Sequence, residues 1–224
     1  MKICIYGAGS IGGLLGAHLA HTGHDVSLVA RGPHLDAIRR DGLRLTGASG
    51  EFTVRPAASD NPGDLGPQDY VIVAVKAPAL PGVVAAMPPL LHDGTCVVAA
   101  MNGIPWWFCD GIGGALEGKQ LRSVDPEGIL ARSIAPERNV GCVVHGGASV
   151  PEPGVVLHKS GGMFLLGEPD HRMSPRVNAL ADAIAATGVK SKAVDDIHQE
   201  IWSKLLGNMG MGPIAVMTGA NLIE

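Results

Sequence analysis

The chain has 224 residues, of which 46% are hydrophobic and 17% are charged, and its formal net charge at pH 7 is −4. This length suits one large domain or one domain and a part, and a negative chain without a basic block is not expected to bind nucleic acid. No apolar run approaches the roughly 20 residues of a membrane span, so the sequence predicts a soluble protein with no membrane partner.

A short apolar run at the start of the chain predicts a strand that is buried on both faces. Residues 3–6 form this run, and Gly7, Gly9 and Gly12 follow at the spacing G-x-G-x-x-G. The first glycine permits a tight exit from the strand, the second leaves room for a pyrophosphate, and the third lets a helix pack closely on the sheet. A helix over about 10–22 would direct unpaired N–H groups at the phosphates. This arrangement predicts dinucleotide binding, with a purely structural glycine turn as the alternative.

The next predicted strand, 26–29, ends near the position that distinguishes NAD from NADP. An acidic residue there would bind the ribose 2′-hydroxyl of NAD, whereas the guanidinium of Arg31 can pair with a 2′-phosphate. Arg31 therefore favours NADP, although an ordinary solvated arginine is the alternative. A short helix over 34–40 and a small hairpin of 43–45 with 52–54 follow.

Two further strands place polar residues at the edge of the predicted sheet. Residues 69–75 form a buried strand that ends at Lys76, and residues 95–100 form another that is followed by Asn102. Open α/β sheets bind ligands at the carboxyl ends of their strands, so both side chains are candidates for ligand contacts. The alternatives are a surface lysine and an Asn-Gly turn. A helix over about 80–91, kinked or ended near its two prolines, connects the strands.

The first hundred residues alternate strands and helices, which predicts a parallel sheet covered by helices on both faces. The aromatic run Trp106-Trp107-Phe108 is interpreted as core packing, with a pocket wall or an exposed contact patch as alternatives. After this run, three segments rich in β-formers predict antiparallel strands that extend the sheet: 140–145, 155–158 and 163–166. A helix over 174–187, capped by Ser174, and an extended edge over 189–194 follow.

The last predicted helix carries both an apolar stripe and a polar row. Asp195 or Asp196 can cap it, and Ile197, Ile201 and Leu205 form the stripe. Glu200, Lys204 and Asn208 recur every four residues and therefore share one face. A lysine beside an apolar stripe can serve as a proton donor, but spacing alone favours an exposed Glu200–Lys204 pair.

Several segments together resemble the ketopantoate reductase family (2-dehydropantoate 2-reductase). They are GAGSIG at 7–12, Arg31, VKAPAL at 75–80, MNGIPWWF at 101–108 and DIHQEIWSKLLGN at 196–208. The resemblance implies NADPH-dependent reduction of a 2-oxo acid, most simply 2-dehydropantoate to pantoate. It also implies a Rossmann-type parallel sheet with an antiparallel extension over 1–194, followed over 195–224 by the start of a helical substrate and dimerisation domain.

The resemblance assigns a role to each matching residue. Lys204 is the general acid, Asn208 binds substrate, and Asn102 touches both substrate and cofactor. The implied cofactor contacts are Gly7, Ala8, Gly9, Ser10, Ile11, Gly12, Arg31, Lys76, Asn102 and, more weakly, Gly147 of the HGG sequence at 145–147.

Two departures from the family pattern keep other functions open. Relatives carry a second asparagine before a proline where this chain has Gly212, and they continue into a longer helical domain. A catalytically weak NADP-binding protein and a reductase of a different 2-oxo acid are therefore alternatives. The incomplete helical region would expose an apolar face, which predicts oligomerisation or a tendency to aggregate, with a homodimer as one form.

The cysteine and histidine patterns predict no metal or disulfide. Four distant cysteines lack zinc spacing and are expected to be reduced in a cytoplasmic protein without a signal peptide. His18, His21 and His24 lie close together without a carboxylate or cysteine to complete a metal set, so they are interpreted as packing or surface residues.

Overall fold

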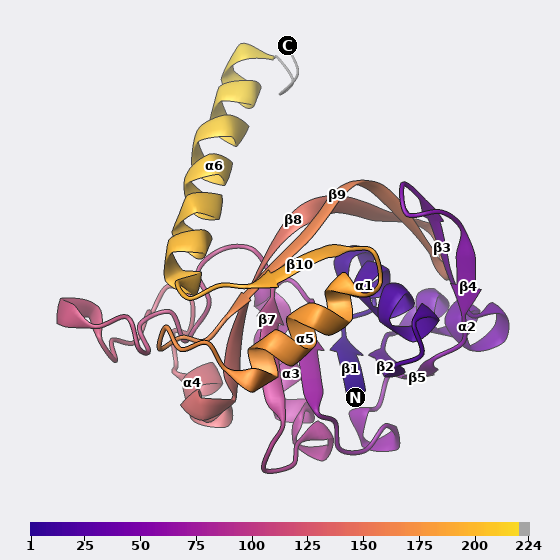
Figure 1. The fold of residues 1–224 in the computed structure, drawn as a ribbon, viewed down its shortest axis with the longest axis horizontal. Helices are drawn as coiled ribbons and strands as arrows, with labels where there is room; N and C mark the ends of the chain where they lie inside the picture. Colours follow the sequence, from indigo (N-terminus) through magenta and orange to yellow (C-terminus); the bar gives the residue numbers. More distant parts are fainter. Residues whose placement is uncertain (220–224) are drawn as a thin grey trace.

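In the computed structural model, which describes residues 1–219, ten strands form one curled sheet (Figure 1). The strands are β1 (Lys2–Tyr6), β2 (Asp25–Val29), β3 (Leu43–Gly47), β4 (Phe52–Val54), β5 (Ala57–Ser59), β6 (Tyr70–Val73), β7 (Cys96–Ala100), β8 (Asn139–Glu152), β9 (Val155–Gly167) and β10 (Lys190–Ala193). The helices are α1 (Ser10–His21), α2 (Gly32–Asp41), α3 (Leu80–Ala86), α4 (Ile129–Ser133), α5 (Pro175–Ala185) and α6 (Ile197–Thr218). The strand order is β4-β3-β9-β8-β7-β6-β1-β2-β5, and β10 pairs with β9.

The strands β8, β7, β6, β1, β2 and β5 are parallel to their neighbours in this order. The central ones are buried on both faces, as the apolar runs predict, because helices cover both sides of the sheet. Helices α1 and α5 belong to one face, whereas α3 and α4 pack on the other. The predicted fold class, a Rossmann-type parallel sheet with an antiparallel extension, is confirmed.

A long antiparallel hairpin of β8 and β9 forms that extension and curves over α1 (Figure 1). Its register shifts between His145 and Gly146 and again between Gly147 and Ala148. A Cβ on Gly146 would lie 2.9 Å from the amide nitrogen of Gly162, so glycine is required where the two strands approach at the bulge. The hairpin bends here without a break, which explains why the segments 155–158 and 163–166 belong to one strand and not to two.

One helix ends at its prolines as predicted, whereas one strand and the end of another helix differ from the sequence prediction. Helix α3 ends at Ala86 and a 3₁₀ turn, Pro88–Leu90, follows, because a proline cannot continue the helix. Strand β5, which the sequence analysis missed, has three residues and no apolar pattern, and it exists through parallel pairing with β2. The sharp end of α5 at Ala185 precedes the predicted boundary by two residues.

The aromatic run after β7 lies in the core, as predicted. Trp106, Trp107 and Phe108 are at most 5% exposed, and they share an apolar cluster with Ile197 and Ile201 of α6. The beginning of α6 is therefore held by this cluster. Figure 1 shows the rest of α6 leading away from the sheet.

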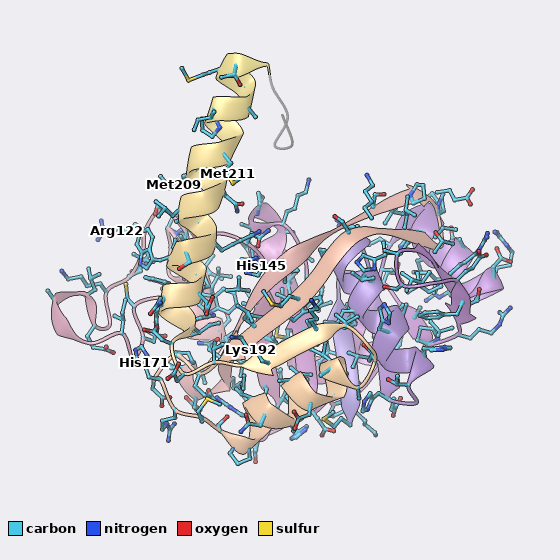
Figure 2. The ribbon with its side chains drawn as sticks, turned by 45° about the horizontal axis from the view of Figure 1, so that its top comes forward. Arg122, His145, His171, Lys192, Met209 and Met211 are labelled. Atoms are coloured by element: carbon cyan, nitrogen blue, oxygen red, sulfur yellow. The ribbon has the colours of Figure 1, made fainter. Side chains whose placement is uncertain are left out.

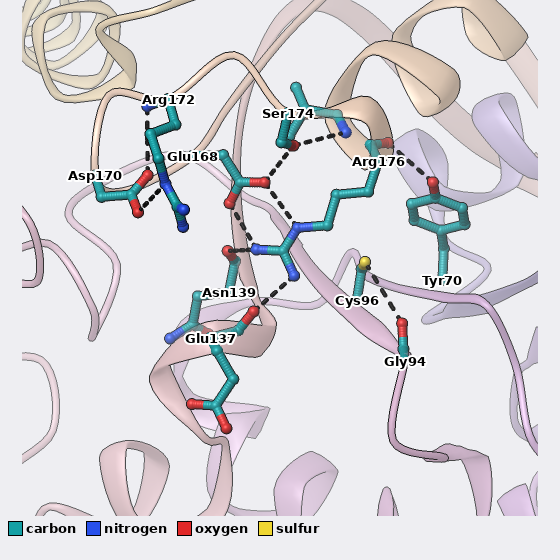
Figure 3. A network of polar contacts seen from close by, with 11 residues as sticks. Tyr70, Gly94, Cys96, Glu137, Asn139, Glu168, Asp170, Arg172, Ser174 and Arg176 are labelled. Carbon is teal, nitrogen blue, oxygen red and sulfur yellow. Dashed lines mark hydrogen bonds and ion pairs between the residues drawn. The ribbon is translucent and has the colours of Figure 1, made fainter.

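A buried ion pair joins the end of β9 to the start of α5 (Figure 3). The Arg176 guanidinium donates to both carboxylate oxygens of Glu168, at 2.7 and 2.6 Å, and the Ser174 hydroxyl donates to the same carboxylate. The Tyr70 hydroxyl on β6 donates to the Arg176 carbonyl oxygen at 2.9 Å. Glu168 is 3% exposed, and this network satisfies its buried charge.

All four cysteines are buried and none forms a disulfide. Within residues 1–219, no helix combines the length and the apolar character needed to cross a membrane.

Candidate active site

The turn between β1 and α1 uses its three glycines in different ways. Gly7 has φ of +102°, which an L side chain rarely adopts, and a Cβ on Gly12 would overlap the Gly7 carbonyl oxygen. The N–H groups of Gly7 and Ala8 both donate to the Val29 carbonyl oxygen, at 3.0 and 3.1 Å. A Cβ on Gly9, by contrast, would meet nothing within 4 Å. Gly7 and Gly12 therefore form the turn, and Gly9 faces open space.

Two cavities adjoin this open space, and Gly9 and Val75 line both of them. The first, which we call the Arg31 cavity, has a volume of about 580 Å³ and is also lined by Gly7, Ala8 and Arg31. The second, the Lys76 cavity, has about 540 Å³ and its further lining residues include Ser10, Ile11, Lys76 and Asn102. The structure thus brings most of the predicted cofactor residues to one continuous edge of the sheet, while Gly12 lies behind the turn.

Arg31 is exposed, and its guanidinium makes no hydrogen bond or ion pair within the described part of the chain. Asp60 lines the same cavity and lies 3.9 Å from the Arg39 guanidinium. The free guanidinium of Arg31 is available to an anionic ligand, and the Asp60 carboxylate offers an acceptor for hydroxyl groups.

His34 also lines the Arg31 cavity, and the sequence analysis did not identify it. Its Nδ1 accepts from the Gly154 N–H at 3.0 Å, so its Nε2 carries the proton and donates to the Ala8 carbonyl oxygen at 2.7 Å. His34 therefore connects the glycine turn to the tip of the β8–β9 hairpin. Its place three residues after Arg31 gives no sequence signal for this role.

Lys76 and Asn102 follow the neighbouring parallel strands β6 and β7, and both side chains are exposed. This placement is the one predicted from the carboxyl ends of the strands. Asn102 additionally lines a more apolar cavity of about 660 Å³, together with Pro78, Met101 and Ile104. Its amide therefore stands between the Lys76 cavity and an apolar space.

The polar row on α6 lies apart from these two cavities. Lys204 is half-buried and Asn208 is exposed, and neither lines the Arg31 cavity or the Lys76 cavity. Burial lowers the pKa of His145 on β8, the Lys204 ammonium lowers that pKa further, and Glu200 raises it. Lys204 and Glu200 of α6 are therefore close enough to His145 to influence its charge.

Gly147, the weakest of the predicted cofactor contacts, lines neither of the two cavities. It pairs with Ser160 next to the bulge in the hairpin, and a Cβ added there would lie 3.4 Å from the Ser160 Oγ. A Cβ here would make only ordinary van der Waals contacts, so the packing of the hairpin does not by itself require glycine at this position.

A comparison with protein families finds a match to the family described as ketopantoate reductase PanE/ApbA over residues 3–171. A 2-dehydropantoate 2-reductase of Mesorhizobium japonicum is 46% identical over 224 residues, which cover 99% of this chain and 68% of that protein. A protein of the same name from Pyrococcus horikoshii is 27% identical, with 97% of this chain and 64% of that protein covered.

Among solved structures, a Ralstonia solanacearum protein described as a ketopantoate reductase is 46% identical, with a TM-score of 0.91. The match covers 97% of this chain and 68% of that one. The chain thus spans about two thirds of the length of the relatives that it matches.

Proposed function

The chain belongs to the ketopantoate reductase family, and on this premise we propose that it binds NADPH and reduces the ketone of a 2-oxo acid, with 2-dehydropantoate as the first candidate. The observation that carries the proposal is the open face of Gly9 between the Arg31 and Lys76 cavities. A pyrophosphate at Gly9 would lie at the start of α1, where unpaired N–H groups favour negative charge.

The choice of NADPH over NADH depends on Arg31. Its exposed, unpaired guanidinium lines the Arg31 cavity and suits a 2′-phosphate. Asp60 in the same cavity is the feature that would instead favour the ribose hydroxyl of NADH. Titration of the protein with each dinucleotide tests the choice, because Arg31→Ala should weaken NADPH binding and leave NADH binding nearly unchanged.

For the chemical step, a bound reduced nicotinamide supplies the hydride that reaches the ketone carbon. We assign the proton for the ketone oxygen to the Lys204 ammonium, and hydrogen bonds to the substrate to Asn102 and Asn208. The half-burial of Lys204 and its electrostatic effect on His145 of β8 support this assignment. Residues 195–224 would then begin the substrate and dimerisation region, of which 220–224 lie outside the described residues.

The function is tested by following NADPH oxidation with a panel of 2-oxo acids. Turnover with 2-dehydropantoate in preference to other acids supports the proposal. A different preferred acid would make the chain a reductase of that acid, and NADPH binding without turnover of any acid would make it a dinucleotide-binding protein.

Substitution Lys204→Met tests the proton donor. A positioned general acid contributes about 10²–10⁴-fold, so kcat should fall by roughly that factor while the Kd for NADPH stays the same. Lys192→Met is the matched control, because Lys192 is an exposed lysine on β10 (Figure 2). Near-normal kcat in Lys204→Met would show that another group supplies the proton.

A further inference from the structure

Three potential metal ligands gather where α6 begins. His171 lies in the loop after β9, and Asp196 and His198 belong to the first turn of α6. Each offers one ligand atom, and these atoms all lie within 4.8 Å of one another. Nδ1 of His171 is 3.7 Å from Oδ1 of Asp196, and the two imidazole rings have centroids 5.2 Å apart. Figure 2 shows His171 beside the first turn of α6.

His198 has a polar group that the protein itself does not satisfy. The residue is 3% exposed, and neither of its ring nitrogens forms a hydrogen bond of good geometry within residues 1–219, although the Phe108 backbone interacts with the imidazole. The rings of Trp107 and Phe108 pack edge-on against it, with centroids 6.0 and 5.0 Å away, and hold its orientation. Buried polar groups are nearly always paired, so an unpartnered imidazole beside two other potential ligands points to a missing ligand.

Asp196 is also held in place, and His171 has an unusual backbone conformation. Oδ1 of Asp196 accepts from the Gln199 N–H at 2.9 Å, which caps α6 and leaves the second carboxylate oxygen for another partner. His171 has φ of 63°, and it is the one non-glycine residue with positive φ within 1–219.

The electrostatic surroundings favour a cation. The Asp196 carboxylate belongs to the cluster, and the Glu117 carboxylate interacts electrostatically with His198. Glu117 is itself fixed by the N–H groups of Gly111 and Gly113, at 2.9 and 2.6 Å. Two imidazoles and a carboxylate are the nitrogen and oxygen ligands that Zn²⁺ binds at about 2.0–2.2 Å, usually in tetrahedral geometry.

We propose that His171, Asp196 and His198 bind a divalent transition-metal ion, with Zn²⁺ as the ion that suits them best, and that this ion fixes the first turn of α6 to the loop after β9. Three protein ligands leave one coordination position for water or another small ligand. Metal binding in this proposal does not depend on the reductase activity.

The position of the site indicates how a bound ion would affect the orientation of α6. Beyond Ile201, no side chain of α6 within the described residues is fully buried. Lys204 lies six residues after His198, about 9 Å along the helix at 1.5 Å per residue. Fixing the first turn would therefore restrict the direction of the helix that carries Lys204.

The experiment is a titration of tag-free protein, first stripped with a chelator, with Zn²⁺ against a chromophoric competitor. We expect one equivalent to bind tightly, Co²⁺ in its place to give the visible bands of tetrahedral coordination, and Zn²⁺ to raise Tm. Hydrogen exchange should slow in the first turns of α6. The absence of stoichiometric binding would overturn the proposal.

The variants are chosen so that folding does not obscure the result. His171→Asn keeps a residue type that tolerates positive φ, at a side chain that is 40% exposed, and should abolish binding and the rise in Tm. His198→Gln should do the same. Unchanged zinc affinity in both variants would overturn the proposal.

His92→Ala is the matched control. His92 and Asp69 form another exposed pair at 3.7 Å, but no third ligand completes a set there within the described residues. Its zinc binding should equal that of the unaltered chain. Loss of zinc binding in His92→Ala would instead locate the ion at His92 and Asp69, and would overturn the assignment.

Discussion

The Rossmann-type body and helix α6 are stabilised in different ways. In the body, β1, β6 and β7 are buried on both faces and two apolar clusters fill the space beneath the helices. In α6, only Ile197, His198 and Ile201 are buried. Of the eleven large hydrophobic side chains that are exposed within residues 1–219, seven belong to α6. Burial thus fixes the edge of the sheet that lines the Arg31 and Lys76 cavities, whereas the proposed proton donor lies on a helix held at one end.

The largest expected contrast comes from removing one apolar side chain in each region. Phe164 on β9 is completely buried, so Phe164→Ala should lower the free energy of unfolding by about 3–5 kcal/mol. Leu206 on α6 is 73% exposed, and Leu206→Ala should change it by no more than about 0.5 kcal/mol. Chemical denaturation measures both. Similar losses in the two variants would mean that α6 is as well packed as the body.

Acid should destabilise the body through His18 on α1. Burial, with smaller contributions from the neighbouring His158 and His21, lowers the pKa of His18 from 6.5 to about 4. Between these values the unfolded chain binds a proton that the folded chain excludes, so this contribution is complete above pH 6.5 and is lost as pH falls toward 4.

The loss from His18 should be on the order of 3 kcal/mol, because each pKa unit corresponds to about 1.4 kcal/mol. His18→Leu removes the titrating group and should flatten the dependence of unfolding free energy on pH over this range. An equally steep profile in that variant would assign the acid sensitivity to other groups.

Two alanine substitutions in the glycine turn should have smaller effects, one on stability and the other on NADPH binding. Gly12→Ala forces a methyl group against the Gly7 carbonyl oxygen and should cost roughly 1–3 kcal/mol of stability. Gly9→Ala meets no atom within 4 Å and should leave stability nearly unchanged while it raises the Kd for NADPH. Denaturation and dinucleotide titration check the pair. Normal NADPH affinity in Gly9→Ala would show that no pyrophosphate rests at this residue.

The smallest effect on folding is expected on the exposed part of α6, where Leu206 and Met209, three residues apart, share one face. We expect the chain to self-associate through this face, since monomers rarely expose apolar patches of this kind. The double substitution Leu206→Glu and Met209→Glu should give a monomer in size-exclusion chromatography. Its unfolding free energy should change by about 0.5 kcal/mol or less. A monomeric unaltered chain would contradict this expectation.

The predictions from sequence succeeded where a local pattern carries the information. The β1 run, the glycine spacing and the α1 periodicity lie within 21 residues, and each was found where it was predicted. The cap of α6 by Asp196 and the cap of α5 by Ser174 follow from single side chains, and both form. The catalytic role of Lys204 remains a prediction.

The features that the sequence analysis missed depend on partners that are distant in the chain. Strand β5 exists through pairing with β2, and the role of His34 requires Gly154, which lies 120 residues away. The separation of His171 and His198 along the chain does not match a zinc-binding motif. Helix α5 and strand β10 lie between them in the sequence, and the fold brings the two imidazoles together.

The sequence by itself determined the glycine turn, the residues at the strand ends and, except for β5, the strands and helices of the first hundred residues, because periodicity, propensity and backbone freedom act over a few neighbouring residues. Only the tertiary structure decided which strands pair, how the β8–β9 hairpin bends over α1, and which side chains lie together at the N-terminal end of α6. Those contacts arise because apolar faces are buried together, and burial brings together polar groups whose separation along the chain gives no sign of it.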